Sequence, residues 1–550
     1  MTTSSAAAQR MIRQRQADQS FNRTLQISRR CESPGTAPGT FERLDWQSST
    51  LLKTTRTPKL RDETDEQAQQ ELRGSITTAE KRMAYETVNP ASGARLKCFD
   101  DISEAGLESA VATAQWAYLT DWRDRPVAER ARILSKAAAL LRERADEYAG
   151  YVTLEMGKLS GAAQAEVQLS AAILDYYASH AEEFSRPKTF SGFPDSVLET
   201  RPIGVILAIE PWNFPYYQVA RVIGPQLAAG NVVLLKHAES VPQCALAFER
   251  LMRDAGAPAG VFTNLFASIE QIGRLIDDPR IAGVTITGSE RAGAAVAERA
   301  GRNLKKVVAE LGGSDPLIVL EDAPLQSTVE SAIFGRMFNT GQSCVSSKRI
   351  IVVGQTRGQA FQDAFVSGMA GLKVGEPTAE DTGLGPVSSE RALNLLLDQI
   401  SAAKKGGAKV VLGGERIDRP GFYLQATVLT DISAENPVYS QELFGPVASL
   451  FVVDTEEEAI ALANASPFGL GGSVFAGDTA RGRAVADRIE SGMVFVNQPA
   501  WTTAELPFGG VKRSGYGREL SELGFGEFVN RKLVTVVQAG SPPWGPVQSG

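Results

Sequence analysis

Two patterns of apolar and polar positions succeed one another along the chain. From residue 104, apolar residues recur every three or four positions, which is the spacing of an amphipathic helix. After residue 203, short apolar runs of strand length alternate with helical stretches. The pattern predicts three long helices first, at residues 104–118, 127–149 and 161–184.

The alternating part divides into two regions. Expected strands in the first region are residues 204–209, 231–236, 261–266, 283–287 and 306–310, with helices near 218–228, 242–254, 269–276 and 292–300. In the second region, strands are expected at 317–320, 349–353, 409–412, 448–453, 472–475 and 492–497. Short apolar strands separated by helices are typical of parallel sheets covered on both faces. We therefore predict an α/β protein with two Rossmann-like parallel-sheet domains, which meet near Gly312 and Gly313.

Several polar residues follow directly after the predicted strands. Asn213, Lys236, Gly288 and Glu310 lie at or just beyond the carboxyl ends of strands in the first region. Ligands bind at these ends in parallel sheets. This placement predicts a binding site at that edge.

One stretch interrupts the first domain. Residues 189–200 alternate between polar and apolar positions, and residues 528–537 could be their partner strand. We expect a small β arm that pairs with another subunit, which predicts a homodimer or homotetramer. The expected bounds are 83–188 and 202–311 for the cofactor domain, 189–201 and 526–538 for the arm, and 312–525 for the catalytic domain.

Length and composition narrow the class of protein. A chain of 550 residues is too long for one core, so two or three domains are expected. With 43% hydrophobic and 22% charged residues, it has the composition of an ordinary soluble protein. A net charge of −7 argues against nucleic acid or an anionic membrane as the main partner. No apolar run approaches the ~18 residues that span a bilayer.

The two ends of the chain differ from the rest. Residues 1–82 lack apolar periodicity, and their first part is rich in arginine and poor in acids. Three alternatives remain open: a disordered tail, a mitochondrial transit peptide, or a natural start at Met83. The protein is expected in the cytoplasm, or in the mitochondrial matrix if the extension is a transit peptide. Residues 539–550 are rich in proline and glycine and are expected to be loose.

Cysteine and histidine usage limits the chemistry. No two cysteines form a CxxC pair, so the sequence predicts neither a zinc ribbon nor a redox dithiol. With two histidines in the whole chain, a histidine-ligated metal site is not expected. The residues concerned are Cys31, Cys98, Cys244, Cys344, His180 and His237.

One cysteine is a candidate nucleophile. Cys344 ends a small polar turn that contains Gly341, and an apolar run follows it. A glycine at this point lets the backbone pass close to a substrate. A thiol attacks carbonyls well, but only as the thiolate. The alternative is an inert buried thiol, which is a common fate of cysteine.

Together, seven short motifs in a fixed order resemble the aldehyde dehydrogenase superfamily, from about residue 85 to 537. The motifs are residues 211–215, 235–236, 287–289, 310–313, 338–344, 442–447 and 507–515. Within the superfamily, residues 235–238, 312–316 and 515–521 are most similar to bacterial short-form succinate-semialdehyde dehydrogenases.

The resemblance implies roles for three residues. Cys344 would attack the aldehyde, with the side-chain amide of Asn213 and the Cys344 backbone N–H stabilising the oxyanion. Glu310 would be the general base that activates water to hydrolyse the thioester. Without the resemblance, Asn213 could be a turn residue and Glu310 a solvated or capping residue.

The cofactor site lacks the usual GxGxxG fingerprint. Gly288 and Ser289 could hold a pyrophosphate where a strand gives way to a helix, or they could simply cap that helix. The resemblance implies further cofactor contacts from Trp212, Lys236, Glu239, Leu311, Glu442 and Phe444. Because the carboxylate of Glu239 would repel a 2′-phosphate, we predict NAD rather than NADP, with NADP as the alternative.

The substrate is inferred from few residues. Arg221 matches a carboxylate-binding arginine of semialdehyde dehydrogenases, and Thr502 and Thr503 fall where a substrate-binding serine is expected. Alternatively, Arg221 makes a surface ion pair. The second arginine of the family is replaced by Phe338.

We therefore predict NAD-dependent oxidation of an aldehyde to an acid, with succinate semialdehyde as the substrate. The alternative within the family is a broad aliphatic or aromatic aldehyde dehydrogenase, whose pocket Tyr217 and Trp501 could line. A CoA-dependent reductase would not need Glu310 as a base. A catalytically silent relative would not need Cys344, Asn213 and Glu310 together.

Overall fold

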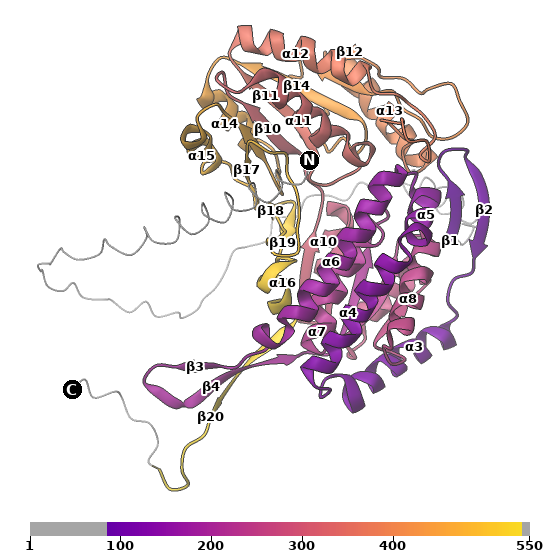
Figure 1. Ribbon diagram of the computed structural model, residues 1–550, viewed down its shortest axis with the longest axis vertical. Coiled ribbons are helices and arrows are strands. Elements are labelled where there is room, and N and C mark those ends of the chain that lie inside the picture. The colour runs from indigo at the N-terminus through magenta and orange to yellow at the C-terminus, as the bar shows by residue number, and fades with distance from the viewer. Residues whose placement is uncertain (1–84, 542–550) are drawn as a thin grey trace, which may run out of the picture. The chain divides into compact units, whose positions relative to one another are not determined.

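The computed structural model describes residues 85–541. The predictions for residues 1–82, and for the tail beyond residue 541, lie outside this range. Two large sheets organise the described residues, and Figure 1 shows the elements in chain order. In this described part, no helix is long and apolar enough to cross a membrane.

The first sheet has six strands in the order β19-β9-β8-β5-β6-β7. Its strands are β5 (Val205–Glu210), β6 (Val232–His237), β7 (Phe262–Asn264), β8 (Ile281–Thr287), β9 (Lys306–Glu310) and β19 (Gly515–Tyr516). Strands β5 to β9 run parallel to one another, and β19 pairs with β9 in the antiparallel direction. These five strands overlap the predicted ones, because strands buried on both faces are continuous apolar runs. The intervening helices are α7 (Tyr217–Ala229), α8 (Pro242–Ala255), α9 (Ile269–Asp277) and α10 (Glu290–Arg302).

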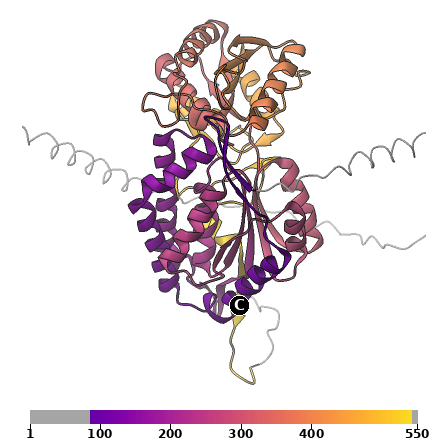
Figure 2. The ribbon, with the colours of Figure 1, turned by 90° about the vertical axis from the view of Figure 1, so that its right-hand side faces the viewer.

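Helices lie on both sides of this sheet (Figure 2). The N-terminal ones are α3 (Glu104–Ala117), the short π-helix η1 (Tyr118–Trp122), α4 (Val127–Glu143), α5 (Ala145–Met156) and α6 (Ser160–Phe184). One helix was predicted at residues 127–149, but the structure has two there, α4 and α5. They are separated at Arg144, which leaves the helical conformation with φ −108° and ψ 27°. Helix α6 packs against α4 and α7. A hairpin of β1 (Tyr85–Asn89) and β2 (Ala94–Phe99) precedes these helices.

The second sheet has seven strands in the order β12-β13-β14-β11-β10-β16-β17. They are β10 (Asp315–Val319), β11 (Ser347–Val353), β12 (Lys409–Leu412), β13 (Thr427–Thr430), β14 (Val447–Val453), β16 (Ser473–Phe475) and β17 (Phe495–Val496). All neighbours are parallel except β12 and β13. Strand β13 was not predicted. The helices of this part are α11 (Leu325–Met337), α12 (Gln355–Ala370), α13 (Glu390–Lys405), α14 (Glu456–Asn464) and α15 (Thr479–Ala486).

The chain passes from the first sheet to the second between Glu310 and Asp315, close to the predicted boundary. The chain returns to the first sheet at β19, before the predicted end of the catalytic domain at residue 525, because β19 pairs with β9. Helix α16 (Ser521–Gly526) then packs against α7. A short pair of β15 (Phe468–Gly469) and β18 (Val511–Lys512) lies on the returning segment.

A three-stranded antiparallel sheet has the order β20-β4-β3. Its strands are β3 (Lys188–Phe190), β4 (Phe193–Pro202) and β20 (Val529–Thr535), and Figure 1 shows β4 and β20 running side by side. Leu198 of β4 lies opposite Leu533 of β20. The predicted partner strands therefore pair within one chain, while their role in oligomerisation stays a prediction.

Candidate active site

Cys344 lies in the loop between the 3-10 helix η2 (Phe338–Gly341) and strand β11. Asn339 and Thr340 both have φ of 56°, in the left-handed region that residues with side chains rarely adopt. Gly341 has φ of 71°, and a Cβ there would lie 2.3 Å from the carbonyl oxygen of Gly445. The close turn predicted at Gly341 is thus present, and the packing around it holds a strained backbone.

A buried arginine, Arg336 at the end of α11, ties this loop to another. Its guanidinium donates to the carbonyl oxygens of Leu443 and Val447 at 2.8 and 2.7 Å, and also to that of Gly445. It makes a longer bond of 3.4 Å to the carbonyl of Gly341. Burial lowers the pKa of Arg336 to about 9. This arginine, which was not predicted from the sequence, joins the loop that carries Cys344 to residues 443–447.

Asn213 lies against the loop that carries Cys344. Its Nδ2 donates to the carbonyl oxygen of Gln342 at 3.1 Å. The carbonyl of Asn213 accepts a bond of 3.0 Å from the side-chain amide of Asn339. The Asn213 amide is therefore fixed close to Cys344, and it would redirect or share its hydrogen bond to stabilise an oxyanion.

Lys348 is a second residue that the sequence analysis missed. Its Nζ donates to the carbonyl oxygens of Ser343 and Cys344 at 2.7 and 2.8 Å. It also lies 3.1 Å from Oε1 of Glu442, and its side chain is 1% exposed. The sequence did indicate a buried role for Lys348, because a lysine at the start of a strongly apolar strand must find a buried partner.

Asp315, at the start of β10, completes this buried charge cluster. Its Oδ1 accepts a hydrogen bond of 3.0 Å from the backbone N–H of Gly471. Burial raises the pKa of Asp315 to about 7, while the positive charge of Lys348 opposes that rise. The sequence analysis assigned no role to this residue.

The side chain of Cys344 is partly buried at the wall of a pocket. Burial raises its pKa to about 12, and the positive charges of Lys348 and Arg221 oppose the rise. The thiol is therefore protonated at neutral pH in this arrangement. A nucleophilic attack requires that the proton leave or that ligand binding stabilise the thiolate.

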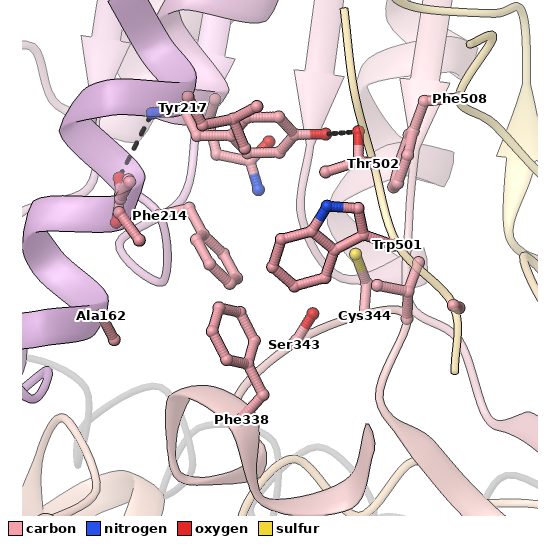
Figure 3. A pocket seen from close by; sticks show the side chains of 15 residues that line it. Ala162, Phe214, Tyr217, Phe338, Ser343, Cys344, Trp501, Thr502 and Phe508 are labelled. Carbon is pink, nitrogen blue, oxygen red and sulfur yellow. Dashed lines mark hydrogen bonds between the residues drawn. The ribbon is translucent and has the colours of Figure 1, made fainter. Parts of the chain in front are cut away.

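The sulfur of Cys344 faces a pocket of about 100 Å³ with mainly aromatic walls (Figure 3). The rings belong to Phe214, Tyr217, Phe338, Trp501 and Phe508. Hydroxyl groups come from Ser343, Tyr217 and Thr502. Within residues 85–541, no lysine, arginine or histidine lines this pocket.

The acid in the pocket wall, Glu166, is already paired. Its carboxylate forms an ion pair with Lys158, and both side chains are almost completely buried. It also accepts hydrogen bonds from the backbone N–H groups of Tyr216 and Tyr217, at 2.8 and 3.2 Å. Glu166 thus braces the start of helix α7, which carries Tyr217.

Arg221 does not line the pocket, although it was predicted to bind the substrate. It is completely buried and forms an ion pair with Glu519. It donates to the hydroxyls of Thr287 and Tyr217 at 3.1 and 3.3 Å. Arg221 therefore makes no surface ion pair, and it lies behind the pocket wall, over the rings of Tyr217 and Phe508. Thr502 does line the pocket, whereas Thr503 does not.

Glu310 ends strand β9 and is also outside the pocket lining. It is 2% exposed, and a Cβ on Gly509 would lie 2.7 Å from its Oε1. Burial raises the pKa of Glu310 well above its usual value, the charge of Glu519 adds to this, and Arg221 opposes it. Because Glu310 is buried, the alternative that it is a solvated surface residue is excluded. To act as a base on a thioester at Cys344, the carboxyl group must rotate toward the pocket.

The predicted cofactor residues lie at the ends of β6 and β8. Lys236, near the end of β6, forms an ion pair with Glu239. Ser289 caps α10, its hydroxyl accepting from the backbone N–H of Ala292 at 3.3 Å. A Cβ on Gly288 would meet no atom within 4 Å, so the space in front of this helix is open. A helix N-terminus beside an open glycine fits a pyrophosphate, and the site therefore fits a dinucleotide.

Two further predicted cofactor residues, Glu442 and Phe444, approach the loop that carries Cys344. The rings of Trp212 and Phe444 lie edge to face, with centroids 5.7 Å apart. Glu442 accepts a hydrogen bond of 3.1 Å from the backbone N–H of Gly313, besides its ion pair with Lys348. Leu311 instead packs under α10, where a Cβ on Gly293 would lie 2.5 Å from it. Glu442 and Phe444 are thus brought to the site that contains Cys344.

The other histidine and cysteine residues of the described part do not line the aromatic pocket. His237 is buried; its Nε2–H donates to the carbonyl of Pro215, and burial lowers its pKa to about 4. Cys98 and Cys244 are free thiols, exposed and buried respectively. Among residues 85–541, no group of three or more histidine, cysteine or acidic residues could hold a metal ion.

Comparisons with known proteins agree with this geometry. A sequence model described as the aldehyde dehydrogenase family matches residues 76–534. A succinate-semialdehyde dehydrogenase (NADP(+)) of Deinococcus radiodurans is 49% identical over 463 residues, which cover 83% of this chain and 96% of that protein. One from Mycobacterium tuberculosis H37Rv is 44% identical over 458 residues, 82% of this chain and 100% of that protein. The solved succinic semialdehyde dehydrogenase of Streptococcus pyogenes, in complex with NADP+, is 44% identical with a TM-score of 0.81, covering 83% of this chain and 100% of that one.

Proposed function

The chain belongs to the aldehyde dehydrogenase family, and on that premise we propose that Cys344 is the nucleophile in the NAD(P)-dependent oxidation of an aldehyde to its acid. The observation that carries this proposal is the position of the Cys344 sulfur. It opens into the aromatic pocket, while Asn213 donates to the carbonyl of Gln342 and Lys348 donates to the carbonyl of Cys344 itself.

The chemistry follows from the residues present. The Cys344 thiol first loses its proton to solvent, and the thiolate attacks the carbonyl carbon to form a thiohemiacetal, whose oxyanion accepts from the Asn213 amide and the Cys344 backbone N–H. Bound NAD(P) supplies the hydride acceptor that oxidation requires. Glu310 accepts a proton from the water that hydrolyses the thioester on Cys344. A base at this position distinguishes the enzyme from a CoA-dependent reductase.

We propose succinate semialdehyde as the substrate. The relatives from Deinococcus radiodurans and Mycobacterium tuberculosis are both named succinate-semialdehyde dehydrogenases. The second candidate is broad oxidation of aliphatic or aromatic aldehydes. One observation favours it: the pocket has aromatic walls, and no cation in the described residues lines it.

The chain uses NAD(P), and the choice between the two cofactors centres on Glu239. Its carboxylate lies beside Lys236, where the resemblance places the adenosine ribose. A carboxylate there accepts bonds from ribose hydroxyls and repels a 2′-phosphate. We propose on this ground that NAD binds better, although the two named relatives are NADP(+) enzymes.

A substrate panel tests the proposal. Succinate semialdehyde, butanal, hexanal and benzaldehyde are compared by kcat/KM from the absorbance of the reduced cofactor. We expect the highest value for succinate semialdehyde, and no turnover of any substrate by Cys344→Ala. Equal values for succinate semialdehyde and hexanal would favour the broad candidate. Full activity of Cys344→Ala would refute the mechanism itself.

We further propose that the β20-β4-β3 sheet pairs with a second copy of the chain. Leu533 is 60% exposed and Val537 is 48% exposed on or beside strand β20. Apolar side chains on an exposed strand are typical of an interface. Sedimentation should therefore show a dimer or tetramer, and Leu533→Lys should shift it toward monomer. A cytoplasmic location stays a prediction.

A further inference from the structure

Glu210 is a buried acid that the proposed mechanism does not use. It ends strand β5 and is 2% exposed. The hydroxyl of Thr287 lies beside it, yet within residues 85–541 neither carboxylate oxygen of Glu210 makes a hydrogen bond of normal geometry. A buried acid without a partner destabilises a folded protein, so its presence requires an explanation.

The register of the first sheet places Glu210 level with the proposed base. Ile209 of β5 lies opposite Ile286 of β8, so the next residues, Glu210 and Thr287, are also level. Thr287 in turn lies opposite Glu310 of β9. Side chains at one level point to the same face, and strands about 4.8 Å apart put the two glutamates about 10 Å apart at the backbone. Their side chains are long enough to approach each other over Thr287, and the charge of Glu310 acts on Glu210.

Arg221 faces this row from helix α7. Its Nη2 donates to the Thr287 hydroxyl at 3.1 Å, and its guanidinium forms an ion pair with Glu519. Glu519 thus balances the charge of Arg221. Burial raises the pKa of both Glu210 and Glu310 well above the usual value, the charge of Glu519 adds to this rise, and Arg221 opposes it. The two carboxyl groups therefore hold at least one proton between them at neutral pH.

The other charged groups around the pair leave this proton in place. Arg518 opposes the rise in the pKa of Glu310, and Glu527 adds to it. His237 on β6 lies opposite Glu210, and burial lowers its pKa to about 4, so it is neutral at pH 7. Within the described part, none of these groups makes a hydrogen bond to the carboxyl group of either acid. A proton on one carboxyl group is therefore the donor available to the other.

We propose that Glu210 is a positioning residue for the base, which keeps its proton and donates it in a hydrogen bond to the carboxylate of Glu310. Two neighbouring carboxyl groups that share one proton ionise in separate steps, the first easily and the second reluctantly. The pair thus supplies an ionised Glu310 near neutral pH, where a lone buried glutamate would stay protonated. After Glu310 takes a proton from water, both acids are neutral, and one proton leaves to solvent before the next turnover. The inference rests on the proposed function, in which Glu310 activates that water.

The test replaces the donor and follows the pH dependence of kcat, with NAD and the best aldehyde of the substrate panel. Glu210→Met removes the donor with little change in length, whereas Glu210→Gln keeps an N–H donor. In Glu210→Met we expect the rise of kcat with pH to move about one pH unit higher, because Glu310 loses the bond that stabilises its anion. Glu210→Gln should stay closer to the unmodified enzyme. The rate of cofactor reduction in a single turnover should be unchanged in both variants, because this step precedes hydrolysis.

Stability separates this role from a structural one. Because the carboxylate of Glu210 has no hydrogen-bond partner in the described residues, Glu210→Met should keep or raise Tm at pH 7. Glu249→Gln is the matched control, since burial also raises the pKa of Glu249, which lies on α8 outside the row. Its pH profile should match that of the unmodified enzyme. Glu210→Leu repeats the test if Glu210→Met does not fold.

The outcomes distinguish the pair from the proposed function. If Glu310→Gln slows hydrolysis but Glu210→Met leaves the pH profile in place, the pair is refuted alone. A profile that moves to lower pH would also refute the pair, because Glu210 would then act as a repelling charge and not as a donor. If Glu310→Gln leaves hydrolysis unchanged, the pair and the proposed role of Glu310 are refuted together.

Discussion

The ammonium group of Lys348 donates a hydrogen bond of 2.8 Å to the carbonyl oxygen of Cys344. The same group lies 3.1 Å from Glu442, a residue expected to contact the cofactor. One buried cation therefore joins the backbone of Cys344 to a predicted cofactor residue. Its charge opposes the burial that raises the pKa of the thiol.

Replacing Lys348 should make the thiol less reactive. Lys348→Met removes the positive charge nearest Cys344, so the pKa of the thiol should rise further. We expect alkylation of Cys344 by iodoacetamide at pH 8 to slow about tenfold, measured on the Cys344 peptide by mass spectrometry. Lys348→Arg keeps the charge and is the control. An unchanged alkylation rate in Lys348→Met would show that this charge does not act on the thiol.

Glu310→Gln should separate oxidation from hydrolysis. The amide cannot accept a proton from water, so the thioester should accumulate after one rapid turnover. We expect an initial burst of reduced cofactor, followed by a steady rate lower by about 10²–10⁴. Glu457→Gln, a surface change beside Arg488, should behave like the unmodified enzyme. Loss of the burst would mean that Glu310 acts before the thioester forms.

The pH dependence of activity should reflect the same carboxyl group. Because burial raises the pKa of Glu310, the group is protonated at low pH and cannot act as a base. The steady rate should therefore rise as pH increases through its pKa. A rate that falls over that range would contradict this role.

Asp315 should make stability depend on pH. Its folded pKa is about 7, whereas an unfolded aspartate has a pKa of about 3.9. Between these values the folded state binds more protons, so stability should fall as pH rises, by up to about 1.4 kcal/mol per pH unit. Above pH 7 this contribution is constant. Asp315→Asn should reduce the slope of Tm between pH 5 and 7, and an identical slope would refute the assignment.

Glu239→Ser should change the cofactor preference. The substitution removes a charge that repels a 2′-phosphate and frees Lys236 from its ion pair. We expect the ratio of kcat/KM for NADP over NAD to rise about tenfold or more. Lys236→Met in the same background should reverse most of the gain. A ratio that does not move in Glu239→Ser would place the selecting group elsewhere.

Much of the fold was predictable because its signal is local. Strands β5 to β9 and most helices of the first domain follow apolar runs whose period reflects the backbone geometry of each segment. The motif order likewise located Cys344 and Asn213, which the structure brings together. The break at Arg144 was missed, because the apolar pattern continues through it.

The sequence alone thus determined the α/β class, the candidate cysteine that the structure places at the pocket, and the strand ends where a dinucleotide fits. Only the tertiary structure decided how the charges are used. Arg221 is paired with Glu519, and Lys348 with Glu442, across long separations in the chain. Whether a charged side chain faces a pocket or a buried counter-ion depends on which segments pack around it. That packing is not encoded in the spacing of residues along one strand or helix, so it becomes visible only when the chain is folded.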